Sequence, residues 1–527
     1  MGTSQANPAT GVNPSDPSSP ELSLPNGKAG GAISWHVVGN FRLFKNEIDV
    51  AYYQDLIKKA ATINTDDLFA DRSSIPDTYY DDNTGSYTVF NEGTGTYSDS
   101  ENYVSPKRWR IALTYDAGGG GQCEWIIDGE SKGSGSCKDF IVEVEGPKHE
   151  IAVRVAGGTQ SVTQKIVIQD ILVAAIGDSW MAGEGNPDVT HVGHIGLFTK
   201  RAAQWLGRNC HRSLYSWPVL SAIQLASNHP QASVTLLDYA CTGATIDKGI
   251  LGTHLGAKEE ETFRSQPPIA RFGSDTFGSE PEATDAIYLE QRKRSQIDKL
   301  KTDLQAGKGR RPDVVLVSIG GNDVGFVKIV VKTEILNEEP CSKDPNHPNQ
   351  DGQFAEKLKR LTNDLDRVRQ EIVKLAPDAD VFLSTYPSPL RLNADQFCDD
   401  PTAHSSGKTR EFGGLVDFFV KGITAEEAKC ASEQIVTPLN EALRRFAKNH
   451  QGEKWRVIDT DGLKGHGYCA PNPQVQTGAW FNTLKDAHQR CGSMRGSMHP
   501  NLFGHLFYVE HAYPIINTAV TRRLTER

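Results

Sequence analysis

The spacing of apolar residues along the chain changes near position 170. Upstream of this point, apolar and polar residues alternate in the runs 109–115, 140–144 and 151–155, and Gly-rich turns separate these runs. Alternation with a period of two, broken by turn residues at short intervals, is typical of antiparallel strands in a sandwich. We therefore predict an all-β, sandwich-like domain at residues 32–169. Within it, the segment 50–105 is ambiguous, because AYYQDLIKKAATI has a helical pattern.

Downstream of Asp170, short and wholly apolar runs are separated by helical stripes. Apolar residues spaced four and three apart between Phe354 and Leu375 predict one helix, and a shorter stripe runs from Ile297 to Leu304. The apolar runs have strand length: ILVAAIG (171–177), VTLLDYA (234–240), DVVLVSIG (313–320), DVFLSTY (380–386) and WRVID (455–459). This alternation predicts an α/β fold, a three-layer αβα domain at residues 170–527 with about five parallel strands.

Composition narrows the class of protein and of partner. The length of 527 residues favours two or three domains, and the net charge of −10 disfavours a nucleic-acid partner. No apolar run approaches the ~18–20 residues of a membrane-spanning helix. Residues 1–31 are rich in Pro, Gly, Ser and Asn and lack the basic and apolar regions of a signal peptide. We predict a disordered leader or linker there, with any signal peptide missing or already removed.

Nine cysteines indicate the compartment. None forms the CxxC pair of a zinc site, so no metal is predicted, and disulfides in an exported protein are favoured over scattered buried thiols. Cys123 and Cys137 flank EWIIDGESKGSGS, which predicts a disulfide that staples a hairpin. An odd number of cysteines leaves at least one thiol free or intermolecular.

Candidate chemistry lies where the first three α/β strands end, as expected for a parallel sheet. Ser179, in GDSWMAGEG, is placed like a nucleophile on a Gly-framed turn, although a capping turn would look the same. Gly243 could bring its backbone N–H close to a substrate or could simply form a turn. The Asn322 amide could donate to a carbonyl oxygen that becomes negative, or Asn322 and Asp323 could only close the strand.

A fourth candidate is His499, in the segment SMHPN near the C-terminus. The residue before a proline is disfavoured in helices, so His499 is expected in a loop from which it could reach the nucleophile. A single loop histidine is more often merely solvated. Each of the four segments is therefore weak by itself.

Taken together, GDS…G…GxND…HPN in this order resembles the four sequence blocks of the SGNH (GDSL-type) hydrolases. The extended forms GDSxxxGEG and HPNxxGH are most similar to secreted actinobacterial-type esterases and lipases, and the resemblance covers roughly residues 170–515. The chain has no GxSxG motif, which excludes the α/β-hydrolase pattern as the origin of this serine.

The resemblance implies a flavodoxin-like catalytic domain and ester hydrolysis without metal or organic cofactor. Ser179 would be the nucleophile and His499 its base. The oxyanion hole would consist of the backbone N–H groups of Ser179 and Gly243 and the amide of Asn322. The family usually places an Asp three residues before the histidine, where this chain has Gly496. We therefore predict a dyad in which a backbone oxygen near Gly496 accepts the Nδ1–H bond, in place of the nearby acids Asp459, Asp461 and Asp486.

The resemblance also implies two disulfides that brace the site, Cys210–Cys241 and Cys469–Cys491. It leaves the pairing of the remaining cysteines open: Cys341, Cys398 and Cys430. Trp180 could line the acyl pocket or cap the core, and structural roles are expected for His466 and His505. The acidic insertion at 252–285 could be a lid or a surface excursion.

These observations predict a secreted, monomeric serine esterase or lipase that prefers short to medium acyl chains. Its partner would be an ester substrate: a lipid, a short-chain ester or an acetylated glycan. The alternatives are an acyltransferase and a polysaccharide acetylesterase whose N-terminal domain binds carbohydrate. A non-catalytic binding protein is disfavoured, because every nucleophile and oxyanion-hole position holds the residue that catalysis requires.

Overall fold

A computed structural model describes residues 31–527 with some gaps. The longer gaps are 257–293, 327–352 and 400–422. The shorter ones are 66–67, 69–72, 83–84, 88, 92–95, 99–100, 117–120, 158–160, 196–197, 255, 463–464, 473 and 494. All but the last residue of the predicted leader at 1–31, nearly all of the insertion at 252–285 and Cys341 therefore lie outside the described residues.

A five-stranded parallel sheet forms the centre of the larger part of the chain. Its strand order is β15-β12-β16-β17-β20, and every neighbouring pair is parallel. The strands are β12 (Gln169–Gly177), β15 (Ala232–Asp238), β16 (Val314–Ser318), β17 (Asp380–Ser384) and β20 (Trp455–Ile458). They coincide with the five apolar runs of the sequence, which confirms the prediction. Four of the five are buried along almost their whole length, because helices cover both faces of the sheet.

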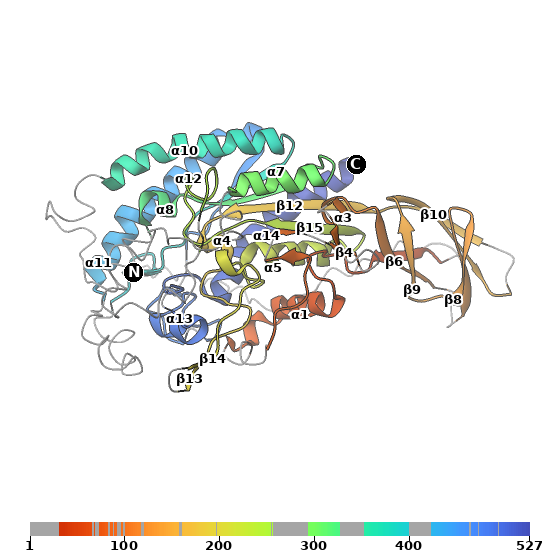
Figure 1. Ribbon diagram of the computed structural model, residues 1–527, viewed down its shortest axis with the longest axis horizontal. Helices are drawn as coiled ribbons and strands as arrows, with labels where there is room; N and C mark the ends of the chain where they lie inside the picture. Colours follow the sequence, from red (N-terminus) through yellow and green to blue (C-terminus); the bar gives the residue numbers. More distant parts are fainter. Residues whose placement is uncertain are drawn as a thin grey trace, which may run out of the picture. The chain divides into compact units, whose positions relative to one another are not determined.

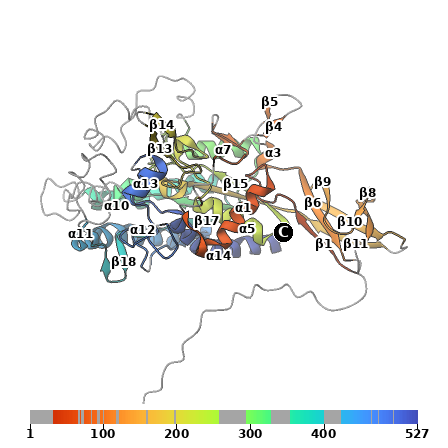
Figure 2. The same ribbon diagram turned by 90° about the horizontal axis from the view of Figure 1, so that it is seen from below.

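Helices lie on both faces of this sheet, which makes the predicted three layers (Figures 1 and 2). One face carries α5 (Trp217–Asn228) and α14 (Leu502–Glu526), and the other carries α7 (Gln296–Ala306), α10 (Gln353–Leu375) and α12 (Thr437–Asn449). Helix α10 spans the long apolar stripe of the sequence. The stripe residues Leu361, Leu365, Val368 and Ile372 are at most 1% exposed, which shows why the stripe repeats at this spacing.

Two further sheets are built from the N-terminal strands. One has the order β11-β10-β7-β8, with antiparallel pairs β10–β7 and β7–β8. Its strands are β7 (Gln122–Ile127), β8 (Glu130–Ser136), β10 (Lys148–Val155) and β11 (Ser161–Val167). The other has the order β1-β6-β9, from β1 (Ile33–Val37), β6 (Arg108–Tyr115) and β9 (Phe140–Glu145). A disulfide joins Cys123 to Cys137 across the β7–β8 hairpin, as predicted.

The chain divides into two compact units. One is built mainly from residues 113–140 and 150–164, and the other from 35–112, 141–149 and 165–527. Residues 35–112 thus belong to the unit of the parallel sheet, where the hydroxyls of Tyr87 and Tyr103 donate to backbone oxygens of β15. The domain boundaries 1–31, 32–169 and 170–527 remain a prediction.

The remaining elements are short, apart from helix α1 (Glu47–Lys58), which falls within AYYQDLIKKAATI and the residues before it. They are η1 (Ala60–Thr62), β2 (Tyr80–Asp81), β3 (Ser86–Tyr87), β4 (Val89–Asn91), β5 (Thr96–Ser98), α3 (Glu101–Val104), α4 (Ser179–Ala182), β13 (Val192–Ile195), β14 (Phe198–Arg201), η2 (Arg208–Cys210), α8 (Gly321–Val324), β18 (Arg391–Asn393), β19 (Gln396–Phe397), α11 (Ala425–Cys430), η7 (Ala431–Val436), η8 (Gln451–Glu453) and α13 (Leu484–Cys491). Within the described ranges, every helix is too short or too polar to cross a bilayer.

The disulfides near the sheet correct one prediction. Cys210 is bonded to Cys241 as predicted, but Cys469 is bonded to Cys398, so the predicted Cys469–Cys491 pair is wrong. Backbone bonds from Gly465 to Leu392 and from Tyr468 to Pro389 lay the segment before Cys469 along the β18–β19 hairpin. Cys398 follows that hairpin directly and therefore meets Cys469. Cys430 is also in a disulfide, and Cys491 is buried at the end of α13.

Candidate active site

The candidate nucleophile Ser179 is held on the turn between β12 and α4. The backbone N–H of Asp178 donates to Ser318 O of the neighbouring strand β16 over 3.0 Å. The Asp178 carboxylate caps α4 by accepting from the N–H of Trp180 at 3.0 Å. Its other oxygen accepts the Tyr386 hydroxyl at 2.5 Å, and burial raises the pKa of Asp178 to about 7. Asp178 therefore fixes the turn and leaves the Ser179 hydroxyl to the site.

His499 lies against Ser179 from a loop near the C-terminus. Its Nε2 atom is 2.9 Å from Ser179 Oγ, and its Nδ1 atom is 3.0 Å from Ser497 O. Met498, between them, has a φ of 61°, a conformation that non-glycine residues adopt at a cost of order 1 kcal/mol. Asn501 caps α14 by accepting from the N–H groups of Phe503 and Gly504.

This geometry agrees with the predicted dyad, in which a backbone oxygen near Gly496 orients the histidine. A carbonyl acceptor makes Nδ1 the protonated nitrogen and leaves Nε2 free to accept the serine proton. Burial lowers the pKa of His499, so near pH 7 the ring is uncharged and can accept a proton.

The three acids near this loop have other partners. Asp486 completes a capping box with Thr483 at the start of α13, accepting its backbone N–H at 2.9 Å. Asp459 and Asp461 both pair with Arg444, at 2.7 and 2.9 Å. These bonds account for all three carboxylates without His499.

The predicted oxyanion-hole residues gather at the ends of β15, β12 and β16. Gly243 has a φ of 76°, which glycine adopts without strain. Asn322 donates one amide hydrogen to Ala244 O at 2.9 Å, which leaves the second hydrogen of its amide available. Within the described part of the chain, the backbone N–H groups of Ser179 and Gly243 donate to no protein acceptor. Three donors thus remain available at this edge of the sheet.

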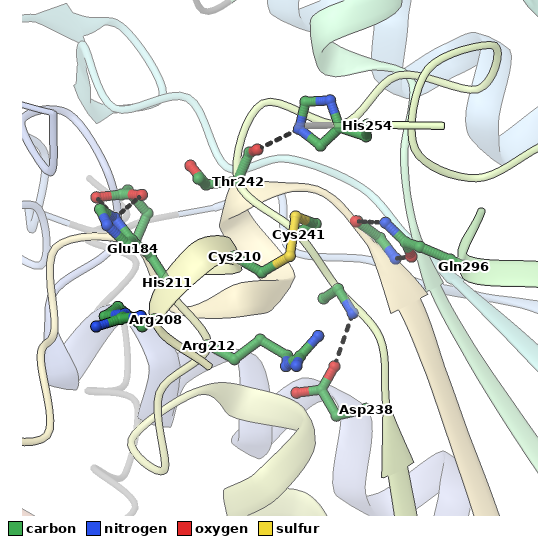
Figure 3. The surroundings of a disulfide bond; sticks show 12 residues. Glu184, Arg208, Cys210, His211, Arg212, Asp238, Cys241, Thr242, His254 and Gln296 are labelled. Carbon is green, nitrogen blue, oxygen red and sulfur yellow. Dashed lines mark hydrogen bonds and ion pairs between the residues drawn. A yellow bond between two sulfur atoms is a disulfide. The ribbon is translucent and has the colours of Figure 1, made fainter. Parts of the chain in front are cut away.

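The Cys210–Cys241 disulfide supports the loop that carries Gly243 (Figure 3). Cys241 donates its N–H to Gly177 O at the end of β12, and Thr242 donates to Cys210 O over 3.1 Å. On the outer side, His254 Nε2 lies 2.7 Å from Thr242 O. The loop is therefore fixed both to the central strand and to the segment around Cys210.

Three other residues singled out in the sequence have structural surroundings. Trp180 is 2% exposed and packs among the rings of Phe326, Tyr386, Phe481 and His499, which favours the core-capping alternative over a pocket wall. His505 is fully buried, and its Nδ1 atom accepts the backbone N–H of Trp217. Burial lowers the pKa of His505 to about 3. His466 bonds Gly478 O and stacks on Trp480, with ring centroids 3.8 Å apart.

Among the described residues, no group of three or more His, Cys, Asp or Glu side chains could hold a metal ion.

Comparisons with known proteins give structural similarity only. No family model and no curated protein matches the chain. It resembles an extracellular lipase from Streptomyces rimosus, with 17% identity, 66% of this chain and 99% of that chain covered and a TM-score of 0.36. Phospholipase A1 from Streptomyces albidoflavus shows 16% identity and a TM-score of 0.33, with 66% of this chain and 98% of that chain covered. A family two carbohydrate esterase from Clostridium thermocellum shows 12% identity and a TM-score of 0.30, with 79% of this chain and 94% of that chain covered. At these values no activity transfers to this chain.

Glu184, His211 and Thr242 lie next to the predicted site segments, and no role was predicted for them from the sequence. Glu184 belongs to the GEG end of the serine motif, and Thr242 precedes Gly243. The Glu184 side chain is 1% exposed, and its oxygens lie 2.8 and 3.0 Å from His211 Nδ1. The sequence signal for Glu184 was its place between two glycines. His211 and Thr242 are remote from it in sequence, so nothing in the sequence indicated that they meet Glu184.

Proposed function

We propose that the chain is a serine ester hydrolase of the SGNH family, with Ser179 as nucleophile and His499 as general base. The observation that carries the proposal is the 2.9 Å contact between Ser179 Oγ and His499 Nε2. A serine hydroxyl is a weak nucleophile until an adjacent base accepts its proton. The fold supports the assignment, because ligands bind beyond the carboxyl ends of parallel strands where the strand order reverses, here between β12 and β16.

The reaction would proceed through an acyl-enzyme. His499 Nε2 takes the proton of Ser179 Oγ as this oxygen bonds to the ester carbonyl carbon, and the carbonyl oxygen becomes negative. The N–H groups of Ser179 and Gly243 and the Asn322 amide donate to that oxygen. The bond to the leaving alcohol then breaks, and His499 returns the proton to it. In the second half, His499 deprotonates a water that attacks the acyl carbon, and the proton goes back to Ser179 as the carboxylic acid leaves.

The proposed substrates are esters with short to medium acyl chains, and the proposed compartment is extracellular. The disulfides Cys123–Cys137, Cys210–Cys241 and Cys398–Cys469 support an oxidising compartment, because cytosolic proteins rarely keep such bonds. We propose that the compact unit built mainly from residues 113–140 and 150–164 binds carbohydrate, orients the enzyme or shields it.

A chain-length series of p-nitrophenyl esters tests the proposal. We expect hydrolysis of the acetate to hexanoate esters and a decline for longer chains. The same assay with an added alcohol or sugar, followed by product analysis, separates hydrolysis from acyl transfer. Release of acetate from acetylated xylan at a higher kcat/KM than from the p-nitrophenyl esters would instead favour a polysaccharide acetylesterase. A chain that hydrolyses none of these substrates would contradict the proposed function.

A further inference from the structure

Glu184 is a buried carboxylate close to the three segments of the site, which carry Ser179, Gly243 and His499. Its backbone N–H donates to Ser179 O over 3.1 Å, so it follows the nucleophile turn directly. Its side chain is bonded to His211, which belongs to the segment tied to the oxyanion loop by the Cys210–Cys241 disulfide (Figure 3). A buried charge this well bonded stays ionised, and the pKa of Glu184 is lowered to about 2.

The residues next to Glu184 are fastened to the histidine loop. Asn482 bridges the two segments: its side chain donates to Gly185 O, and its backbone N–H donates to His499 O over 2.9 Å. The Asn186 side chain donates to Pro500 O over 2.7 Å. A Cβ atom on Gly185 would lie 2.9 Å from Gly496 O, so the two backbones are already in close contact. The Glu184 carboxylate is therefore held at a fixed position relative to the His499 ring.

The charges that face His499 are few. In the part of the chain that the structure describes, the titratable groups that act on the pKa of His499 are Glu184 and His211, and Glu184 is the acid of the two. His505 is uncharged near neutral pH, because burial lowers its pKa to about 3. Burial lowers the pKa of His499, whereas the charge of Glu184 raises it and is the largest opposing effect. A protonated His211 acts in the opposite direction on the pKa of His499. Neither ring nitrogen of His499 bonds Glu184, since Nδ1 faces Ser497 O and Nε2 faces Ser179 Oγ.

We propose that Glu184 is a positioning residue that stabilises the His499 imidazolium through space, in place of the carboxylate that completes a catalytic triad. The inference rests on the proposed function, because the imidazolium forms only when His499 takes the serine proton. A carbonyl oxygen orients the ring but carries no full charge, so the dyad alone leaves this cation poorly compensated. In a buried site the attraction between two unit charges is only weakly screened, and it acts without a hydrogen bond. His211 sets how much of the Glu184 charge His499 experiences.

The test compares Glu184→Gln with the wild type by two measurements. Titration of 13Cε1-labelled histidines by NMR, with His499 assigned from the His499→Asn spectrum, gives the His499 pKa directly. The acidic limb of the pH profile of kcat/KM for p-nitrophenyl acetate reports the pKa of the same group. In Glu184→Gln we expect the His499 pKa from NMR and the pKa of the acidic limb each to fall by about one unit, and the plateau kcat to fall about tenfold. Without the Glu184 charge, the imidazolium is less stable relative to the neutral ring.

The controls separate charge from structure. Asp459→Asn removes one negative charge from the Arg444 pair and should move neither measurement. His211→Gln keeps Glu184 and removes the imidazole whose effect lowers the His499 pKa, so this pKa should rise. If Glu184→Gln does not fold, this variant decides alone. A Glu184→Gln protein that loses activity with an unchanged or raised His499 pKa would overturn the inference, as would a His211→Gln protein without a rise. An inactive wild type whose His499 titration still responds to Glu184→Gln would contradict the proposed function and not the coupling.

Discussion

His499 Nε2 lies 2.9 Å from Ser179 Oγ, although 320 residues separate the two in sequence. Each partner is fixed by its own set of bonds, Ser179 through the Asp178 cap and His499 through the Ser497 carbonyl and the Asn501 cap of α14. The pair is therefore formed before any substrate binds. A preformed pair contributes to catalysis because little reorganisation is left for the reaction itself.

Replacing Asn322 by Ala should lower kcat by about 10²–10³ with little change in KM, because the amide acts mainly on the oxyanion of the transition state. Steady-state kinetics with a p-nitrophenyl ester measure both constants. The bond from Asn322 to Ala244 O is lost as well, so thermal unfolding should be followed in parallel. A rise in KM at constant kcat would make Asn322 a ground-state binding residue instead.

Asp459→Asn, Asp461→Asn and Asp486→Asn should each keep turnover within about fivefold of the wild type, because these carboxylates pair with Arg444 and Thr483 and not with His499. The kcat of each purified variant is the measurement. A fall of about 10⁴ for one of them, the loss seen when the Asp of a triad is neutralised, would identify a true triad.

His505 should make the protein less stable in acid. Its folded pKa of about 3 lies below its ordinary value, so below about pH 6.5 the unfolded chain binds a proton that the folded protein does not. This contribution is complete above pH 6.5 and decreases as the pH falls toward 3, by about 2 kcal/mol at pH 5.

His505→Asn isolates this effect, because an Asn oxygen can still accept the Trp217 N–H but takes up no proton in this range. The free energy of unfolding of both proteins is measured with denaturant at pH 7.5 and pH 5. The stability advantage of the wild type over the variant should be smaller at pH 5 than at pH 7.5. An advantage that stays constant with pH would show that His505 is protonated in the folded state.

Non-reducing peptide mapping should recover Cys123–Cys137, Cys210–Cys241 and Cys398–Cys469. Removing the Cys210–Cys241 bond by a double Ser substitution should cost about 2–4 kcal/mol and should lower turnover, because the bond braces the loop of Gly243. A Cys469–Cys491 peptide in the map would restore the pairing that the family resemblance implied.

The α/β half of the fold could be predicted from the sequence because its signals are local. Five apolar runs and the four-three stripe of α10 each reflect burial of one element, and all were found at their positions. Ser179, Gly243 and Asn322 could be singled out for a related reason, since each of them follows a strand of the parallel sheet.

What could not be predicted depends on contacts between distant segments. Cys469 meets Cys398 only because the loop before it lies along the β18–β19 hairpin. Residues 35–112 join the parallel-sheet unit through buried side chains such as Phe41 and Tyr53 and through bonds such as Tyr103 to Leu236 O, contacts whose partners no local spacing indicates. Glu184 acquires its surroundings from His211, Thr242 and the histidine loop, and no spacing within GDSWMAGEG indicates any of them.

The most direct test is the turnover of p-nitrophenyl acetate by purified Ser179→Ala. The proposed function predicts a fall of at least about 10³-fold with an unchanged unfolding temperature, because the hydroxyl is the nucleophile and its loss leaves the Asp178 cap intact. Ser227→Ala is the matched control, since that hydroxyl donates to Ile223 O within α5 and its loss should leave turnover unchanged. A Ser179→Ala protein that keeps even a tenth of the wild-type rate would show that another group performs the attack.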